Sequence, residues 1–334
     1  MSDVTRPADG PVTPGNRLEA SVDGSAGPWT DVYGLARTLL ALGTLMTLLS
    51  DGVDLLFRPL GMEVTEGVSD IPLLRLSLFS LLGGERLEWA RWLAVLILLS
   101  VISGWKPRIT GVLHWWVTAS FAVSCVIVEG GDQAAAILTL LLVPVTLTDP
   151  RRSHWATRPV PIAGLRRRLQ AITASSALGA IRLQVAVIYL FAFAVKLTVP
   201  EWANGTALYY WFLHPVFGLS GWSRAVLASA LGSPVVVTLL TWAALAMEAL
   251  LFMGLLMERR YRPWLFAGGV LFHVGIAITH GLVSFGIIMV AGLVLYLRPA
   301  ERPLCAGGFA WWHHRRAASR WLREAWSGVP REAA

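Results

Sequence analysis

Residues 185–206 read VAVIYLFAFAVKLTVPEWANGT, in which the apolar run Val185–Val199 carries one charge, Lys196, near its end. Trp202 and Gly205 follow at close range. A lysine left at the centre of a membrane span costs about 2.5–3.5 kcal/mol, and less near an end where the side chain can reach the interface. The position of Lys196 therefore needs a functional or structural reason.

Composition places the whole chain among integral membrane proteins. Hydrophobic residues make up 55% of the 334 residues and charged residues only 15%, and the mean hydropathy is +0.59. A soluble domain could not bury that much apolar surface. The net charge of +7 comes from basic loops between apolar segments, so membrane lipids are expected partners and nucleic acid is not.

Apolar segments close to the length of about 20 residues needed for a span recur along the chain. They predict an all-α fold, a polytopic bundle of about eight transmembrane helices. Two further apolar stretches, Ile71–Leu82 and Thr206–Trp222, are broken by proline and polar residues and predict outer interfacial helices that roof the bundle. The expected spans are Val32–Leu49, Trp89–Ser103, Ile109–Val128, Asp132–Leu147, Leu178–Val199, Pro234–Met257, Trp264–Thr279 and Val283–Leu297.

Three parts are expected along the chain. Residues 1–31 are rich in Pro, Gly, Ser and Asp and predict a disordered cytoplasmic tail. Residues 32–298 form the transmembrane domain. Residues 299–334 form a basic cytoplasmic tail, in which the tryptophans and arginines of Phe309–Trp326 predict an interfacial helix on anionic lipid.

The distribution of charge among the loops predicts the orientation in the membrane. The connection 149–170 carries six arginines, and the positive-inside rule places it in the cytoplasm. Counting spans from there puts Lys106, Arg259 and Arg315 on the same side and Glu129 and Glu201 on the other. We therefore expect a multi-pass cell-membrane protein with both termini in the cytoplasm.

Several polar residues fall within the predicted spans. Arg37, Arg91, His114 and Arg182 lie near helix ends, where snorkelling or an interhelical pair explains them. Glu248 lies more than two turns from either end of its span and must be paired or protonated. A structural Arg182–Glu248 ion pair and a proton-handling role are both open for it.

Lys196 and His273 are the candidate catalytic residues, because the predicted topology places both in the outer half of the membrane. A poorly solvated lysine loses its proton more readily and becomes a competent base or nucleophile. A neutral histidine nearby could orient the lysine or accept a bond from a substrate, although simple packing also explains a lone histidine. His280, next to Gly281, marks either a substrate gap or a tight turn.

The two cysteines, Cys125 and Cys305, are expected at opposite ends of the spans. A disulfide needs their Cα atoms within about 7 Å, so none is predicted. The sequence contains no pair of cysteines with metal-ligand spacing, and no metal site is predicted.

The segments Lys196-Leu197, Trp202–Ala207 and Phe272-His273, with the early Arg37, resemble the horizontally transferred transmembrane (HTTM) domain shared with vitamin K-dependent gamma-glutamyl carboxylases. The resemblance implies that Lys196 matches the lysine that deprotonates vitamin K hydroquinone on the extracytoplasmic side. It also implies a quinone cofactor, for which Trp202, Gly205 and His280 are the candidate binding residues. The carboxylases have a histidine where this chain has Glu129–Gln133, so glutamate carboxylation does not follow.

Within that superfamily the chain is most similar in layout to the bacterial sporulation-delaying protein B (SdpB) family. This resemblance implies a partner of the SdpA type, a small membrane-associated protein, and a secreted peptide precursor as the molecule that is handled. Three functions stay open: maturation or export of an antimicrobial peptide, a quinol-dependent enzyme of carboxylase or epoxidase type, and a non-enzymatic scaffold, exporter or immunity component.

Overall fold

The computed structural model describes residues 27–57, 74–82, 84–126, 128–215, 217–219, 221–300 and 304. Every regular element within these ranges is a helix, and one isolated bridge joins Trp105 to Ser153. The predicted all-α fold is therefore confirmed for this part of the chain. Residues 1–26 and the predicted tail helix Phe309–Trp326 lie outside the described residues.

Each predicted span falls on one long helix. The long helices are α2 (Asp31–Ser50), α5 (Leu87–Ile102), α6 (Pro107–Ser124), α7 (Gly130–Thr148), α8 (Gly164–Leu197), α12 (Pro234–Met253), α13 (Arg262–His280) and α14 (Val283–Leu297). The helix α8 begins 14 residues before the span predicted for it. The short ones are α3 (Val53–Phe57), η2 (Leu74–Leu76), α4 (Leu78–Leu81), η3 (Gly84–Arg86), α9 (Pro200–Ala203), α10 (Ala207–Phe212) and α11 (Gly221–Leu231).

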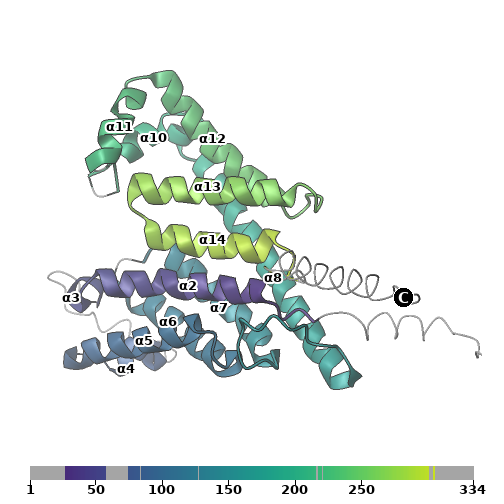
Figure 1. Ribbon diagram of the computed structural model, residues 1–334. Helices are drawn as coiled ribbons and strands as arrows, with labels where there is room; N and C mark the ends of the chain where they lie inside the picture. The colour runs from purple at the N-terminus through teal and green to yellow at the C-terminus, as the bar shows by residue number, and fades with distance from the viewer. Residues whose placement is uncertain are drawn as a thin grey trace, which may run out of the picture.

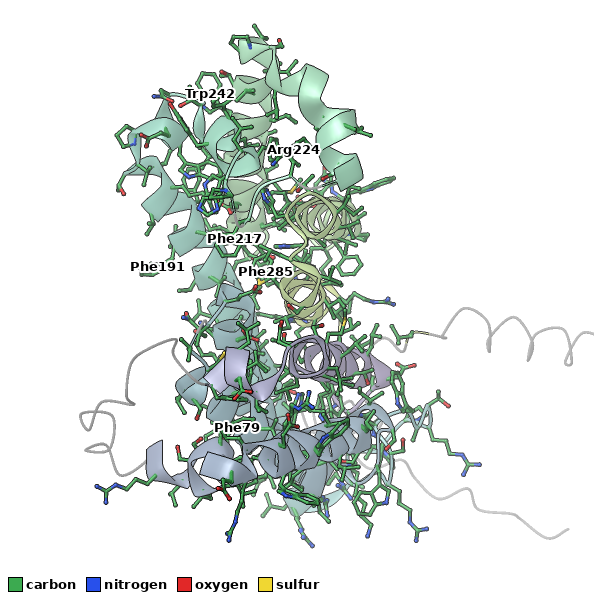
Figure 2. The ribbon with its side chains drawn as sticks, turned by 90° about the vertical axis from the view of Figure 1, so that its left-hand side faces the viewer. Phe79, Phe191, Phe217, Arg224, Trp242 and Phe285 are labelled. Atoms are coloured by element: carbon green, nitrogen blue, oxygen red, sulfur yellow. The ribbon has the colours of Figure 1, made fainter. Side chains whose placement is uncertain are left out.

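Among the described residues, five helices, α2, α7, α8, α12 and α13, are long and apolar enough to cross a membrane. Large apolar side chains cover their outer surfaces: Phe191, Trp242 and Leu271 are 64%, 50% and 72% exposed, and Figure 2 labels the first two. Such a surface is stable only against lipid. The chain is thus a multi-pass membrane protein, and membrane crossing by α5, α6 and α14 stays a prediction.

The helix α14 lies at the centre of the bundle. It packs against α2, α7, α8 and α13, and Figure 1 shows α2, α14 and α13 side by side, with α5 and α6 beyond α2. The same three helices form a column when the molecule is turned by 90° (Figure 2). Because nearly every α14 side chain from Ile288 to Leu297 is buried, this helix joins the two halves of the bundle.

Close helix approach depends on two glycines. A Cβ on Gly111 of α6 would collide with the Thr146 side chain of α7, and one on Gly43 of α2 would collide with Ile288 of α14. Small residues at such contacts let helix backbones approach closely in membranes.

Replacing Gly111 with valine is therefore expected to lower the free energy of unfolding by about 1–3 kcal/mol, the usual effect of overpacking. Unfolding of the purified protein in mixed micelles by added SDS measures this. Gly179→Val on α8 is the matched control, because a Cβ there meets nothing within 4 Å. An equal loss in both variants would mean that the α6–α7 contact is not tight.

The bundle has two faces, and we call the one where α2 begins and α14 ends the terminal face. Thr30 Oγ1 donates to Ala300 O at 2.5 Å there, and Lys106 N donates to Arg152 O at 2.8 Å. The connections α5–α6, α7–α8 and α12–α13 all lie at this face, together with their basic residues. The predicted grouping of Lys106, Arg151 and Arg259 on one side is thus confirmed, whereas its assignment to the cytoplasm stays a prediction.

The predicted interfacial stretches form short helices at the opposite face. The elements η2 and α4 pack against α6, where Leu78 N donates to Ser120 Oγ at 2.9 Å. The helix α10 packs against α12, where Leu208 N donates to Thr241 Oγ1 at 3.3 Å. Only the α10 segment therefore lies near the candidate lysine.

Candidate functional site

Lys196 forms an ion pair with Glu248 inside the bundle. Its Nζ lies 2.5 Å from Glu248 Oε1, and the side chains are 27% and 8% exposed. The same ammonium lies 5.3 Å from the centre of the Trp202 ring, a cation–π distance. Both charges are thus neutralised by each other, which is the condition for keeping them away from water.

This pair corrects the predicted one. An Arg182–Glu248 pair was one of the two alternatives for Glu248, but Arg182 lies 14 residues before Lys196 on α8, about 21 Å along the helix axis. It lines a cavity at the terminal face instead. The prediction named the right acid and the wrong base.

The physical reason is an offset between α8 and α12. Lys196 is the penultimate residue of α8, whereas Glu248 follows 14 residues of α12, so α12 extends about 21 Å beyond the end of α8. The helices α9 and α10 cover that extension. Lys196 therefore lies at the depth of Glu248, and not at an outer boundary as the sequence suggested.

A second polar pair lies on the same side of α8. Tyr189 Oη and His273 Nε2 are 2.8 Å apart, and both residues are 2% exposed. Tyr189 precedes Lys196 by seven residues, so two helical turns bring both side chains to one face of α8. The two pairs lie about 10 Å apart along α8, since seven residues at about 1.5 Å each separate Tyr189 from Lys196.

We call Tyr189, Lys196, Glu248 and His273 the bundle site. Lys196 and His273 were predicted as site residues, and the fold places them in two neighbouring pairs along α8. Tyr189 was missed, although its spacing from Lys196 was a usable signal. Within the described part of the chain, buried Glu248 Oε2 and His273 Nδ1 have no hydrogen-bond partner, so the site retains capacity for a further polar group.

The three candidate cofactor-binding residues make packing contacts within the protein. Trp202 is 9% exposed in a cluster with Ala207 and Leu245. Gly205 has a φ of +84°, and a Cβ there would lie 2.6 Å from the Thr238 side chain. A glycine is needed here both for the backbone conformation and for the close approach.

His280 belongs to a different cluster. Its Nδ1 lies 2.7 Å from Phe217 O, and its ring stacks on Phe212 with centroids 5.5 Å apart. Trp202 and His280 thus pack in different clusters, and Gly205 lies against Thr238. The quinone cofactor that the carboxylase resemblance implies stays a prediction.

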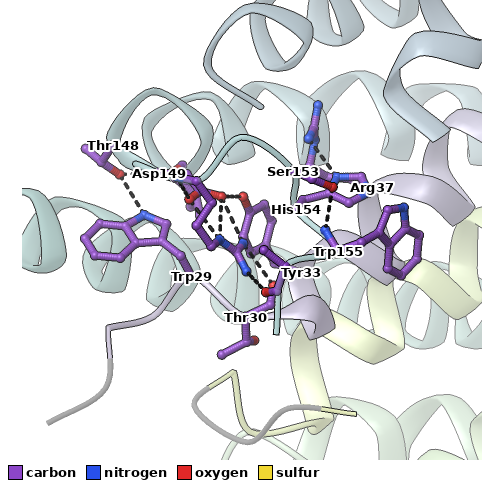
Figure 3. A network of polar contacts seen from close by, with 12 residues as sticks. Trp29, Thr30, Tyr33, Arg37, Thr148, Asp149, Ser153, His154 and Trp155 are labelled. Carbon is purple, nitrogen blue, oxygen red and sulfur yellow. Dashed lines mark hydrogen bonds and ion pairs between the residues drawn. The ribbon is translucent and has the colours of Figure 1, made fainter. Parts of the chain in front are cut away.

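A separate polar network lies at the terminal face (Figure 3). We call Tyr33, Arg37, Asp149, Arg151 and His154 the terminal network. Asp149 accepts hydrogen bonds from the Tyr33 hydroxyl and from the Arg151 guanidinium, whose Nη2 lies 2.9 Å away. Arg37 Nη1 lies 2.9 Å from His154 Nδ1, and Arg37 Nη2 donates to Thr110 Oγ1 at 3.1 Å. Arg37 is therefore an interhelical link, one of the two alternatives left open for it.

His154 is held neutral within this network. Burial first, and then the charges of Arg37 and Arg151, lower the pKa of His154 from 6.5 to about 3. Since a guanidinium can only donate, His154 Nδ1 accepts from Arg37, and the ring proton belongs on Nε2.

The protein is therefore expected to lose stability as the pH falls from about 6.5 toward about 3. Over this interval the unfolded chain binds a proton at His154 that the folded chain excludes, so acid favours unfolding. SDS-titrated unfolding at about pH 7.5 and about pH 5 measures the loss. His154→Gln keeps an acceptor for Arg37 and should show a smaller loss; an equal loss would assign the acid sensitivity to other groups.

The fold and the site define an all-helical, multi-pass membrane protein with an ion pair and a tyrosine–histidine pair inside its bundle. Comparison with known proteins narrows this class. The chain is 41% identical to the Bacillus subtilis (strain 168) protein YitO over 278 residues, 82% of this chain and 87% of the relative. It is 35% identical to the sporulation-delaying protein SdpB of the same organism over 291 residues, 86% of this chain and 87% of the relative.

The chain belongs to the SdpB family. No family model and no solved structure matches it. The wider resemblance to the HTTM domain of carboxylases stays a prediction.

Proposed function

We propose that this SdpB-family protein is a maturation or export factor for a secreted antimicrobial peptide. The family relationship supports the role, and the bundle site supports a place for its chemistry. The proposed partners are a small membrane-associated protein of the SdpA type and the peptide precursor. The orientation proposed with it has eight spans, with the terminal face in the cytoplasm.

The observation that carries the chemical part is the pair of buried polar atoms without hydrogen bonds, Glu248 Oε2 and His273 Nδ1. A polar group of a substrate peptide that enters the bundle could bond to either of these atoms. The Lys196–Glu248 pair beside them could then accept or return a proton without leaving a lone charge in hydrocarbon.

Proton exchange requires that the ion pair open to the substrate. Lys196 is the more exposed partner, at 27% for its side chain, so the ammonium is the group that a substrate meets first. Glu248 would act by holding that ammonium in place, as a positioning residue, and Tyr189 would hold the His273 ring. This assigns roles to all four residues of the bundle site without a quinone.

The test is reconstitution in a bacterial host that lacks its own SdpB-family proteins. Cells produce the precursor and the SdpA-type partner, with or without this chain, and mass spectrometry identifies the peptide in the medium and in the cells. We expect mature peptide in the medium only when this chain is present. Mature peptide trapped inside cells without the chain would indicate export alone, and equal release without the chain would contradict the proposal.

A further inference from the structure

A cavity of about 370 Å³ lies at the terminal face, about two helical turns from Tyr189 and His273 of the bundle site. Three helices contribute to it: Arg182 from α8, Arg262 from the start of α13, and Leu297 from the end of α14. Small-ligand sites usually have volumes of about 300–1,000 Å³. The cavity is thus large enough for a small molecule or for the head group of a lipid.

The described charged side chains that line this cavity are all basic. Arg182, Arg259, Arg262 and Arg298 line it, and no acidic side chain does so among the described residues. The like charges of Arg259, Arg262 and Arg298 repel each other around one space. An anion placed between them would remove that repulsion and accept several charge-assisted hydrogen bonds.

The start of α13 adds to the positive potential. This helix has 19 residues, no acidic residue in its first turn, and proline at its first positions. The dipole of a helix of this length places partial positive charge at its N-terminus, where an acidic side chain is usual. In α13 the first residue is instead an arginine, Arg262. The Nε of Arg262 donates to Met257 O at 3.1 Å, and this hydrogen bond fixes the orientation of the guanidinium.

The remaining wall is apolar. Phe266 and Leu297 line the cavity beside the arginines, and both belong to helices of the membrane bundle. A ligand that fits both parts carries a negative charge at one end and hydrocarbon at the other. Arginine groups favour phosphate because their planar fork binds two of its oxygens at once.

We infer that this cavity is a binding site for the phosphate group of an anionic glycerophospholipid, with the four arginines around the phosphate and Phe266 and Leu297 against the acyl chains. This lipid site shares no residue with the bundle site, and the inference does not depend on the function proposed for the bundle site. The cavity lies at the basic face of the bundle, and basic residues at a membrane surface attract the head groups of anionic lipids.

Native mass spectrometry of the delipidated full-length protein tests this, with phosphatidylglycerol, phosphatidylcholine and inorganic phosphate as separate probes. We expect phosphatidylglycerol to be retained and the other two not. The variant Arg262→Gln/Arg298→Gln should weaken phosphatidylglycerol binding at least about tenfold. Arg260→Gln is the matched control, because Arg260 is exposed, pairs with Glu258 and does not line the cavity.

Two results would overturn the inference. Equal retention of phosphatidylcholine, or unchanged binding in the double variant, would show that the arginines do not recognise the phosphate. Saturable binding of inorganic phosphate with equal affinity would assign the site to a soluble phosphate compound. If the double variant does not accumulate, Arg298→Gln alone, at the end of α14, is measured by the same titration and should weaken binding several-fold.

Discussion

Replacing Lys196 with methionine is expected to reduce the release of mature peptide by about 10²–10⁴-fold, the range for loss of a group that transfers protons. Methionine retains the volume of the lysine stem and deletes only the ammonium. Mass spectrometry of the medium measures the product, and immunoblotting of membranes measures the amount of protein.

Loss of stability is the competing explanation, and a second variant separates the two. Lys196→Met leaves Glu248 with an unpaired carboxylate at 8% exposure, which can cost about 3–5 kcal/mol. The double variant Lys196→Met/Glu248→Gln removes both charges and should recover most of that stability. Because it still lacks the ammonium, it should accumulate normally and yield no mature peptide.

Lys106→Met is the matched control, because Lys106 is the only other lysine in the chain. Its side chain lies over the Trp105 ring at the terminal face, away from the bundle site. Release at the wild-type level from this variant is expected. Normal release from Lys196→Met or from the double variant would contradict a role for the ammonium and would favour a scaffold.

Replacing Asp149 with alanine is expected to lower the free energy of unfolding by about 3–5 kcal/mol. Asp149 is 0% exposed, and its partner Arg151 has a side chain that is 5% exposed. Without the carboxylate, the guanidinium is left buried without its counter-charge. The Tyr33 hydroxyl on α2 also loses its acceptor, so the contact between α2 and the α7–α8 connection weakens.

SDS-titrated unfolding compares this variant with two controls. Asp149→Asn keeps the shape and an acceptor but removes the charge, so its loss should be intermediate. Tyr33→Phe removes one hydrogen bond and should cost about 0.6–1.5 kcal/mol. If Asp149→Ala lost no more stability than Tyr33→Phe, water would have to reach Arg151, and the terminal network would not be closed to solvent.

The sequence was a good guide to the helices and a partial guide to the bundle site. The eight apolar segments fall on the eight long helices, because an apolar segment of this length forms a helix in a membrane regardless of what packs against it. The first 14 residues of α8, which include Arg166, Arg167 and Arg168, precede its predicted span. The shared face of the basic loops also followed, since each span reverses the chain. Lys196 and Glu248 stood out because charge inside an apolar segment always needs compensation.

The partner of Glu248 could not be found from the sequence. From the sequence, the depth of a residue in the membrane follows from its distance to the nearest helix end. That rule holds only if α8 and α12 end at the same level. The short helices α9, α10 and α11 let α12 start about 21 Å beyond the end of α8, which lowers Lys196 to the level of Glu248. His154 was missed for a related reason: it lies in a connecting loop, and only packing buries it against Arg37.

The amino-acid sequence by itself determined that this chain is a helical membrane protein, where its helices lie, and which loops share a face. These properties depend on the free energy of moving each segment from water to lipid, which is local and adds along the chain. Only the tertiary structure decided which charges meet: Lys196 with Glu248, Arg151 with Asp149, and Arg182 with three other arginines around a cavity. Side-chain pairing depends on the offset and rotation of neighbouring helices, and these are set by packing between segments that are distant in the sequence.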